Sequence, residues 1–321
     1  MTASSVRVVA EPEFERMVAP LRAELHVHCY RMLGSVHDAD DAVQESLVRA
    51  WRNLDKLTDP AGLRPWLYRI ATNRCLTLLE TRRRRELPVD LSPGAPLTDI
   101  AWLEPYPDAD VRGRAPEARY EAREAVELAF VAALQYLPGL QRAALVLRDV
   151  LGFSARETAE LLEISVASAN SALQRARAGV EARLPAQSQQ RALHTMTDHE
   201  IRDLAGQYVA AWESGDVTAI VALLSADAKY SMPPLPEWYA GEAAIREFLL
   251  GGPLRYRWRF LLASANGQLA FGTYLWDDER AVFAAMALDV VAVRDGRIAE
   301  VVSFLEPALF PSFGLPVDLP A

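Results

Sequence analysis

The sequence is poor in cysteine: Cys29 and Cys75 are its only two, and neither has a second cysteine or a histidine at metal-ligand spacing. A disulfide framework and a zinc site are therefore not expected, and both thiols are expected to pack as small apolar side chains. The chain also lacks a long apolar run, an internal repeat, and a basic start followed by an apolar core. We expect neither a membrane span nor a secretory signal, and hence a cytoplasmic protein.

The net charge of -9 argues at first against a nucleic-acid partner. The distribution of charge matters more, because the residues from Thr197 onward contain about 9 basic and 17 acidic side chains, which leaves the first two thirds nearly neutral. Within that part, residues 82–85 are four consecutive arginines, and Arg175 and Arg177 close a second helical segment. Such local basic patches can bind phosphates on a neutral domain, because the field of a charge decays within about 8 Å at physiological salt.

A length of 321 residues suits two or three domains, and the composition divides the chain accordingly. Helical periodicity covers residues 1–86 and is expected again over a domain at residues 117–186. Between them, residues 87–116 contain six prolines and two glycines, which predicts an extended linker. A third domain is expected over residues 197–306, followed by a C-terminal tail over residues 307–321.

The third domain combines helices with a sheet. Helical segments are expected at residues 198–214, 216–224 and 241–250, and strand-like runs at residues 256–263, 269–276, 281–293 and 298–305. Asp295-Gly296 between two apolar runs is a strong signal for a hairpin turn. Helices followed by an antiparallel sheet predict an α+β domain.

Residues 37–54 predict an amphipathic helix. Its apolar face carries five residues at helical spacing: Val43, Leu47, Ala50, Trp51 and Leu54. Its outward face carries four polar residues: Asp41, Gln44, Glu45 and Arg52. By itself this pattern fits an ordinary surface helix with a solvated polar face.

The next segment changes this interpretation, because residues 63–74 read L-R-P-W-L-Y-R-I-A-T-N-R and lead to the four arginines. The pattern D-A-x-D-x-x-Q-E…R-x-W followed by W-L-x-x-I-A-x-N resembles region 2 of sigma factors. By that resemblance, the outward face of the first helix docks on the clamp helices of core RNA polymerase. The second helix would face the minus-10 promoter element through planar and cationic side chains: Arg64, Trp66, Tyr68, Arg69, Asn73 and Arg74. Packing in the core is an equal alternative for Trp66.

Residues 154–180 predict a helix-turn-helix. Ser154 and Glu157 form a capping box for the first helix, and Ser165 can cap the second. The second helix has apolar residues at helical spacing: Val166, Ala169, Leu173, Ala176 and Val180. With its cap, its exposed side carries the residues expected on DNA: Ser165, Ala167, Ser168, Asn170, Ser171, Gln174, Arg175 and Arg177. Small and amide side chains can approach base edges, while arginines reach phosphates.

Together with Gln141-Arg142 upstream, this segment resembles sigma factor region 4, which reads the minus-35 element. The resemblance implies a contact with the flap of core RNA polymerase. Asn170 and Ala172 replace residues that are often Lys and Arg in that family. Weaker phosphate anchoring is therefore expected here.

The element order of residues 197–306 resembles SnoaL-like domains of the NTF2-like superfamily, in which a curved sheet and helices form a cone with an apolar mouth. By that resemblance, five aromatic side chains are candidates to line a pocket: Trp212, Tyr230, Trp238, Trp258 and Tyr274. They could contact a small apolar ligand or simply fill the cone. For any one of them, packing is the stronger expectation.

Enzymes of this fold need a carboxylate of tuned pKa inside the cone and a partner hydrogen-bond donor. The available acids are Asp227, Asp289 and Glu306, and residues 224–228 around Asp227 read as a turn. No histidine follows Glu200. We find no catalytic constellation in the sequence, and expect no enzymatic activity, no metal and no cofactor.

The sequence thus predicts a multidomain chain: all-α sigma region 2 and region 4 (helix-turn-helix) domains, followed by an α+β NTF2-like cone-shaped domain. It resembles an extracytoplasmic-function (ECF) sigma factor, which implies core RNA polymerase and promoter DNA as partners and no membrane. The C-terminal domain is expected to regulate in cis, its acidic surface contacting the basic surfaces of the other two. The alternatives are a SnoaL-like cyclase or isomerase enzyme tethered to a DNA-binding module, and a plain DNA-binding repressor, which would need no region 2 signature.

Overall fold

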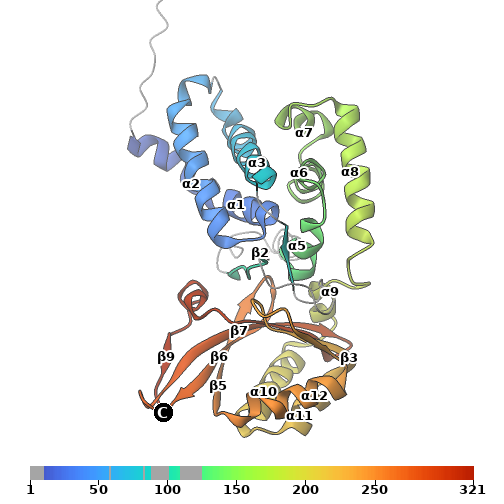
Figure 1. Ribbon diagram of the computed structural model, residues 1–321. Coiled ribbons are helices and arrows are strands. Elements are labelled where there is room, and N and C mark those ends of the chain that lie inside the picture. Colours follow the sequence, from blue (N-terminus) through green and yellow to red (C-terminus); the bar gives the residue numbers. More distant parts are fainter. Residues whose placement is uncertain (1–10, 58, 82–83, 88–100, 109–124) are drawn as a thin grey trace, which may run out of the picture. The chain divides into compact units, whose positions relative to one another are not determined.

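The computed structural model describes residues 11–57, 59–81, 84–87, 101–108 and 125–321 (Figure 1). The chain forms two compact units. The helical unit comprises Met1–Arg85 and Phe130–Leu184, and the C-terminal unit comprises Glu86–Ala129 and Pro185–Ala321. The predicted succession of an all-α part and an α+β part is confirmed.

Three long helices open the helical unit: α1 (Glu11–Leu33), α2 (Val36–Arg52) and α3 (Leu63–Thr81), with short 3-10 turns η1 (Leu54–Lys56) and η2 (Pro60–Gly62) between the last two. Ser35 caps α2, because its side chain accepts the Asp38 N–H. The predicted apolar face of α2 is buried except at its end. There Trp51 remains 37% exposed and packs 5.2 Å from the ring of Phe14, so its assignment to the buried face was wrong.

The second half of the helical unit contains α5 (Leu128–Gln135, with residues from Phe130 onward in this unit), α6 (Gly139–Leu145), the π-helical turn η5 (Val146–Val150), α7 (Ala155–Leu161) and α8 (Val166–Glu181). The predicted capping box of Ser154 and Glu157 begins α7, and Ser165 caps α8. Leu173, Ala176 and Val180 of α8 join the core of this half. Val166 is 43% exposed, because the first turn of α8 extends beyond the helices it packs on.

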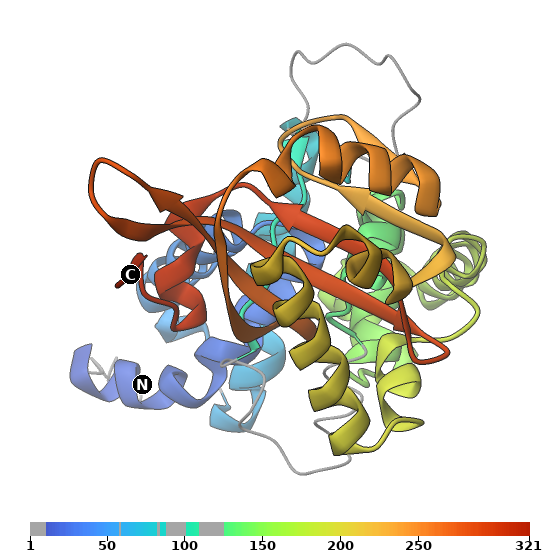
Figure 2. The ribbon, with the colours of Figure 1, turned by 90° about the horizontal axis from the view of Figure 1, so that it is seen from below.

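A curved seven-stranded sheet is the centre of the C-terminal unit (Figure 1). Its strands are β3 (Leu224–Ser231), β4 (Trp238–Ala240), β5 (Trp258–Ala265), β6 (Gln268–Asp277), β7 (Val282–Arg294), β8 (Arg297–Phe304) and β9 (Asp318–Leu319). Their order is β4-β3-β8-β7-β6-β5, with β9 paired to β7. The helices α10 (Asp198–Ser214), α11 (Val217–Ala222) and α12 (Glu242–Gly251) lie on one face of this sheet (Figure 2).

Shorter elements complete this unit. They are β1 (Arg85–Glu86) and β2 (Ala101–Trp102), which pair with each other, the helix α9 (Gln189–His194), and the 3-10 segments η6 (Pro253–Arg255) and η7 (Pro307–Phe313). The predicted Asp295-Gly296 turn joins β7 to β8, and both residues have left-handed backbones with φ of 51° and 72°.

Two expectations for the sheet were wrong. Residues 224–228, read as a turn, form the start of β3, where Leu224, Ser225 and Ala228 are buried and Leu224 pairs with Ile298 of β8. The sheet is also not wholly antiparallel, since β3 runs parallel to β8. The connection from β3 to β8 contains β4, α12 and β5–β7, and a connection of this length allows the two strands to run parallel.

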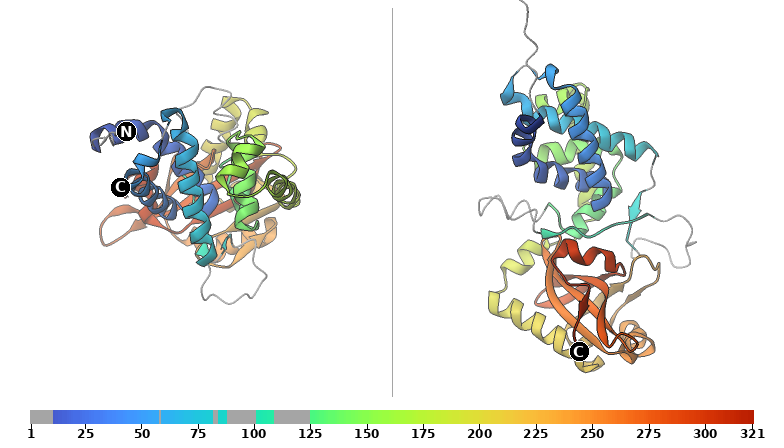
Figure 3. Two further views of the ribbon diagram at one scale, coloured as in Figure 1. Left: turned by 90° about the horizontal axis from the view of Figure 1, so that it is seen from above. Right: turned by 90° about the vertical axis from the view of Figure 1, so that its left-hand side faces the viewer.

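Residues 307–321, predicted as a tail, are part of the fold. The segment η7 packs against β7, and β9 adds to the edge of that strand (Figure 3). Leu309, Phe310 and Leu315 are buried. Gly272 on β6 makes room for them, because a Cβ there would lie 2.6 Å from Leu315 Cδ1.

Within the described ranges, no helix is long and apolar enough to cross a membrane. The same residues contain no group of three histidine, cysteine or acidic side chains arranged to hold a metal ion. Cys29 and Cys75 are both buried free thiols, as the sequence predicted.

Candidate functional site

The outward face of α2 carries the four residues expected to contact polymerase. Asp41, Gln44 and Arg52 are exposed, whereas Glu45 is half-buried. The Arg74 guanidinium on α3 donates a 2.8 Å hydrogen bond to Glu45. Glu45 is therefore tied to α3, and the other three side chains are part of the accessible surface of α2.

Helix α3 carries the residues expected to face the minus-10 element, and they differ in exposure. Arg69 and Asn73 are exposed, while Arg64, Trp66 and Arg74 are half-buried. An exposed amide and an exposed guanidinium one turn apart can together contact a base edge and a phosphate. This part of α3 is the candidate DNA-contacting surface.

Tyr68, which we expected beside these residues, is fully buried and cannot stack on a base. Its ring meets that of Phe153 edge-on at 5.5 Å, and its hydroxyl donates to Glu24 at 3.3 Å. The Arg64 guanidinium lies 5.1 Å from the Phe153 ring centroid and 3.4 Å from the Glu24 carboxylate. Because Phe153 directly precedes α7, the helix-turn-helix covers part of α3 within the helical unit.

The exposed side of α8 is arranged as predicted: Ala167, Ser168, Asn170, Ser171, Gln174, Arg175 and Arg177 are all exposed. Arg177 donates two hydrogen bonds, of 2.8 and 2.7 Å, to the Asp149 carboxylate. This pairing raises the pKa of Arg177. The surface is thus rich in amide and hydroxyl groups, and one of its two arginines is held by an acid.

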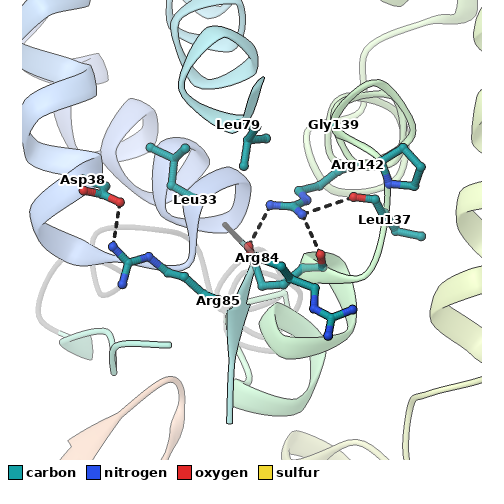
Figure 4. A pocket seen from close by; sticks show the side chains of 10 residues that line it. Leu33, Asp38, Leu79, Arg84, Arg85, Leu137, Gly139 and Arg142 are labelled. Atoms are coloured by element: carbon teal, nitrogen blue, oxygen red, sulfur yellow. Dashed lines mark hydrogen bonds and ion pairs between the residues drawn. The ribbon is translucent and has the colours of Figure 1, made fainter. Parts of the chain in front are cut away.

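A cavity of about 200 Å³ lies in the helical unit between the ends of α1 and α3 and the start of α6 (Figure 4). Arg142 of α6 is 3% exposed and fills one side of it. Its guanidinium donates to the Gln135 side chain (2.7 Å), to the carbonyls of Gln135 (2.9 Å) and Leu137 (3.2 Å), and to the Met32 carbonyl at the end of α1. Burial lowers the pKa of Arg142 to about 10, so it stays charged at neutral pH.

The predicted basic run lies partly outside the described residues, namely at Arg82 and Arg83. The other two arginines are engaged within the helical unit. The Arg84 guanidinium lies 4.1 Å from the ring centroid of Tyr136, and Arg85 forms a 2.7 Å ion pair with Asp38 beside the cavity (Figure 4).

A second cavity, of about 290 Å³, lies in the C-terminal unit, and its lining is mostly aromatic and aliphatic. Of the five predicted pocket residues, Trp212, Tyr230 and Trp258 line it. Trp238 lies on β4 away from the lining. Tyr274 is buried elsewhere and donates a 2.9 Å hydrogen bond to the Pro316 carbonyl.

Asp289 on β7 lines this cavity and is 1% exposed. The Tyr208 hydroxyl on α10 donates to Asp289 Oδ2 at 3.2 Å. Burial raises the pKa of Asp289 to about 6, against a smaller lowering by the hydroxyls of Ser303 and Tyr208. The cone therefore contains a carboxylate of tuned pKa and a hydroxyl donor, a pair that we did not find in the sequence.

Replacing Asp289 should stabilise the C-terminal unit at high pH. A carboxyl whose pKa is raised from about 4 in the unfolded chain to about 6 contributes stability below pH 4 that is lost as the pH rises through 6. Asp289→Asn keeps an acceptor for Tyr208, and should raise the free energy of unfolding by about 1–3 kcal/mol at pH 8 and leave it unchanged at pH 4. Urea unfolding followed by tryptophan fluorescence measures this. A loss of stability at pH 8 would contradict it, and the surface variant Asp227→Asn serves as control.

The turn between β5 and β6 anchors the segment that precedes α5. This segment, residues 87–127, extends beyond the predicted linker at residues 87–116, because the C-terminal unit includes the chain as far as Ala129, and it is called the linker below. Asn266 is fully buried there, with a left-handed backbone (φ 55°). Its Oδ1 accepts the Tyr106 N–H at 2.8 Å, and its Nδ2 donates to the Val126 carbonyl at 2.7 Å. One side chain thus holds two points of the linker that are 20 residues apart in the sequence.

Neighbouring residues strengthen this anchor. The Gly267 N–H donates to Asp108 Oδ1 at 2.7 Å, and Gln268 Oε1 accepts the Leu128 N–H at 2.8 Å. Leu103 is buried with 1% exposure. The described parts of the linker are therefore built into the C-terminal unit by hydrogen bonds and apolar contacts.

Residues 185–190, which follow the helix-turn-helix in the chain, take part in the same assembly. Glu127 is buried and accepts the N–H groups of Gln189 (2.9 Å) and Gln190 (2.7 Å) at the start of α9. The Gln189 side chain also pairs with the backbone of Val293, donating at 3.2 Å and accepting at 2.6 Å. Both glutamines are buried, so this segment is a structural element.

Comparison with known proteins places each part in a family. Residues 17–85 match the family model for sigma-70 region 2, residues 127–178 that for sigma-70 region 4, and residues 205–301 that for the SnoaL-like domain. The chain is 41% identical to the ECF RNA polymerase sigma factor SigG of Mycobacterium tuberculosis (strain ATCC 25618 / H37Rv), over 96% of this chain and 85% of SigG.

A second relative from the same strain is the ECF RNA polymerase sigma factor SigJ, which is 29% identical over 90% of this chain and 91% of SigJ. The crystal structure of Mycobacterium tuberculosis SigJ matches with a TM-score of 0.61 and 27% identity. That match covers 96% of this chain and 100% of the SigJ chain. The SigJ match therefore spans residues of both the helical unit and the C-terminal unit.

Proposed function

Because this chain belongs to the ECF RNA polymerase sigma factors, we propose that its SnoaL-like domain regulates promoter recognition in cis through the linker between regions 2 and 4. Sigma factors bind core RNA polymerase and promoter DNA, and direct transcription initiation. The relatives reported above are sigma factors rather than enzymes.

The observation that carries this proposal is the anchoring of the linker at Asn266. Tyr106 and Val126 are 20 positions apart, and a flexible segment of that length would separate its ends by about 25 Å on average. Docked, both ends bind one side chain. Docking therefore shortens the reach of the chain that joins region 2 to region 4.

To bind both promoter elements at once, regions 2 and 4 must be joined by a chain that can span the distance between the elements. The minus-10 and minus-35 elements lie about 25 base pairs apart, which is roughly 85 Å at about 3.4 Å per base pair. In the helical unit, Arg64 of α3 packs on Phe153 beside α7, so region 2 and region 4 are in contact. This contact must open before α3 and α8 can reach both elements, and a docked linker opposes the opening.

Each exposed surface of the helical unit has a role in this function. The exposed Asp41, Gln44 and Arg52 of α2, with Glu45 beside them, bind the clamp helices, and region 4 contacts the flap. Helix α3 contacts the minus-10 element through Arg69 and Asn73, and Arg64 becomes accessible as region 4 moves away from it. Trp66 and Arg74 lie half-buried on the same helix and contribute at its border. The exposed side of α8 contacts the minus-35 element. Exposure of polar side chains on α2, α3 and α8 supports these roles.

Reversing the charge of Asp41 should weaken binding to core polymerase. Asp41 is exposed on the face of α2 that we assign to the clamp helices, and reversing a charge inside an interface disrupts its electrostatic complementarity. Asp41→Arg should raise the Kd for core RNA polymerase at least about tenfold, as measured by fluorescence anisotropy of a labelled chain. The matched control is Glu15→Arg on α1, whose side chain is 56% exposed. Equal Kd values for the two variants would rule out this assignment.

The proposed regulation is tested by run-off transcription with purified core RNA polymerase on genomic promoter fragments. The full chain is compared with a version ending near Ala186, which lacks the SnoaL-like domain. Specific initiation with a different yield from the two forms supports regulation in cis. Equal yields would refute regulation in cis. No initiation from either form would favour the alternative of a SnoaL-like enzyme tethered to a DNA-binding module.

A further inference from the structure

The cavity of the C-terminal unit has an acid without a cation. Among its lining residues in the described part of the chain, Asp289 alone carries a charge, and none is lysine, arginine or histidine. Its walls include Trp212, Tyr230, Trp258 and Phe260. Such walls offer a cation the negative faces of several rings, close to a carboxylate.

Asp289 is also incompletely hydrogen-bonded. Tyr208 donates to Oδ2, and the Ser303 hydroxyl also lowers the pKa of the carboxyl, but Oδ1 has no hydrogen bond of ordinary geometry to the residues that the structure describes. Buried carboxylate oxygens normally accept hydrogen bonds, because an unsatisfied acceptor in an apolar site is destabilising. A ligand donor would satisfy this acceptor by displacing the side chains that keep Asp289 at 1% exposure.

We propose that this cavity binds a small primary amine with a flat apolar body, whose ammonium group binds Asp289 and whose body packs between the aromatic walls. The inference deepens the proposed regulatory function, on which it rests for its biological role. A volume of about 290 Å³ is near the lower end of the range of small-molecule sites, about 300–1,000 Å³, and suits a body of one or two rings. Leu235 and Tyr256 line the cavity and are 42% and 61% exposed, which marks the entrance.

The geometry favours an amine over other polar groups. An alcohol supplies a donor for Oδ1 but leaves the carboxylate charge uncompensated. A carboxylic acid would bring a second negative group beside Asp289, which like-charge repulsion disfavours. An ammonium group supplies both the donor and the opposite charge, and gains a cation–π contribution from the walls.

Three probes of one shape test this choice. They are 2-(naphthalen-2-yl)ethylamine, 2-(naphthalen-2-yl)ethanol and naphthalen-2-ylacetic acid, each titrated into the full chain at pH 7.5 by calorimetry. The amine should bind at least about tenfold more tightly than the alcohol, and the acid most weakly. Equal affinities for amine and alcohol, tighter binding of the acid, or no binding of the amine would each overturn the proposal.

A variant pair locates the site. Asp289→Asn should weaken amine binding at least about tenfold and change alcohol binding by less than about threefold. The control is Asp227→Asn, because Asp227 lies on the surface of β3 and pairs with Ser225 and Arg294. Equal loss of amine binding in both variants would overturn the assignment to Asp289.

The pH dependence of the wild-type chain keeps the test independent of variant folding. Burial raises the pKa of Tyr208 and Tyr230, the titratable groups that face Asp289, well above 10, so both stay neutral. The pKa of Asp289 is raised to about 6. Amine affinity should therefore fall severalfold between pH 7.5 and pH 5, and an unchanged affinity would overturn the proposal.

These titrations contain no polymerase and no DNA. Absence of amine binding would therefore overturn the ligand inference and leave regulation through the linker standing. Failure of linker variants to alter transcription would remove the regulatory function, while a measured amine affinity that depends on Asp289 would still establish the site.

Discussion

Asn266→Ala should raise promoter-dependent initiation by the full chain about fivefold or more. The substitution removes the acceptor for the Tyr106 N–H and the donor for the Val126 carbonyl, and leaves both linker groups buried without partners. Leaving a buried polar group unsatisfied costs about 1–3 kcal/mol, which shifts a docking equilibrium by about 5- to 150-fold. The undocked linker then permits regions 2 and 4 to separate.

The measurement is run-off transcription at limiting sigma factor, with wild type and variant at equal concentration. The matched control is Asp295→Ala, which places alanine at nearly the same left-handed backbone conformation (φ 51° against 55°) in the exposed β7–β8 turn. Both variants carry the same backbone strain, so their difference reports the linker contacts. An Asn266→Ala yield equal to that of the control would contradict the account.

Arg142→Ala should lower the free energy of unfolding of the helical unit by about 2–4 kcal/mol. The Arg142 guanidinium donates hydrogen bonds to the Gln135 side chain and to three backbone carbonyls, one of which lies in the last turn of α1. Each buried acceptor left without a donor costs about 1–3 kcal/mol. The adjoining cavity of about 200 Å³ can admit water to part of them, so the sum falls short of four full penalties.

Chemical unfolding followed by circular dichroism at 222 nm measures this loss. Arg156→Ala is the control, because its side chain is 87% exposed and its ion pair with Glu160 lies on the surface of α7. Surface pairs of this kind contribute about 0–1 kcal/mol, so the control should unfold close to wild type. Similar stabilities for Arg142→Ala and the control would show that the buried network contributes little.

The helical unit could be predicted closely because its determinants are local. The capping residues Ser154 and Ser165, and apolar residues at helical spacing, set the bounds of α7 and α8 without reference to distant contacts. Trp51 and Val166 deviate because they lie at helix ends, where the neighbouring helix no longer covers the predicted face. Tyr68 deviates for a different reason: Phe153, 85 residues further along the chain, covers it.

The linker anchor and the carboxylate in the cone depend on contacts between distant parts of the sequence. Asn266 binds residues 140 and 160 positions before it, and no periodicity signals such contacts. Asp289 gave a usable signal, since it is the only charged residue in an apolar run from Val282 to Val293, and a charge in a buried strand requires a partner. Its neighbour Tyr208 lies on another element and could not be paired with it from spacing alone.

The central claim is that docking of the linker on the SnoaL-like domain restrains transcription. A reversible disulfide that holds the linker in its docked position tests this claim most directly. Pro107 and Ala265 form an antiparallel bridge flanked by the hydrogen bond from the Asn266 N–H to the Tyr106 carbonyl. They are thus a pair that is not itself hydrogen-bonded, with Cα atoms about 4.5 Å apart, which a disulfide can span. The native Cys29 and Cys75 are buried with 0% exposure, so the double variant Pro107→Cys/Ala265→Cys should cross-link selectively.

The measurement is run-off transcription by this double variant, oxidised and then reduced, beside wild type treated identically. The account predicts that the oxidised form, with its linker held on the SnoaL-like domain, gives about fivefold or more less transcript than the reduced form, and that wild type does not respond. Equal transcript from the locked and the reduced double variant would contradict regulation through linker docking.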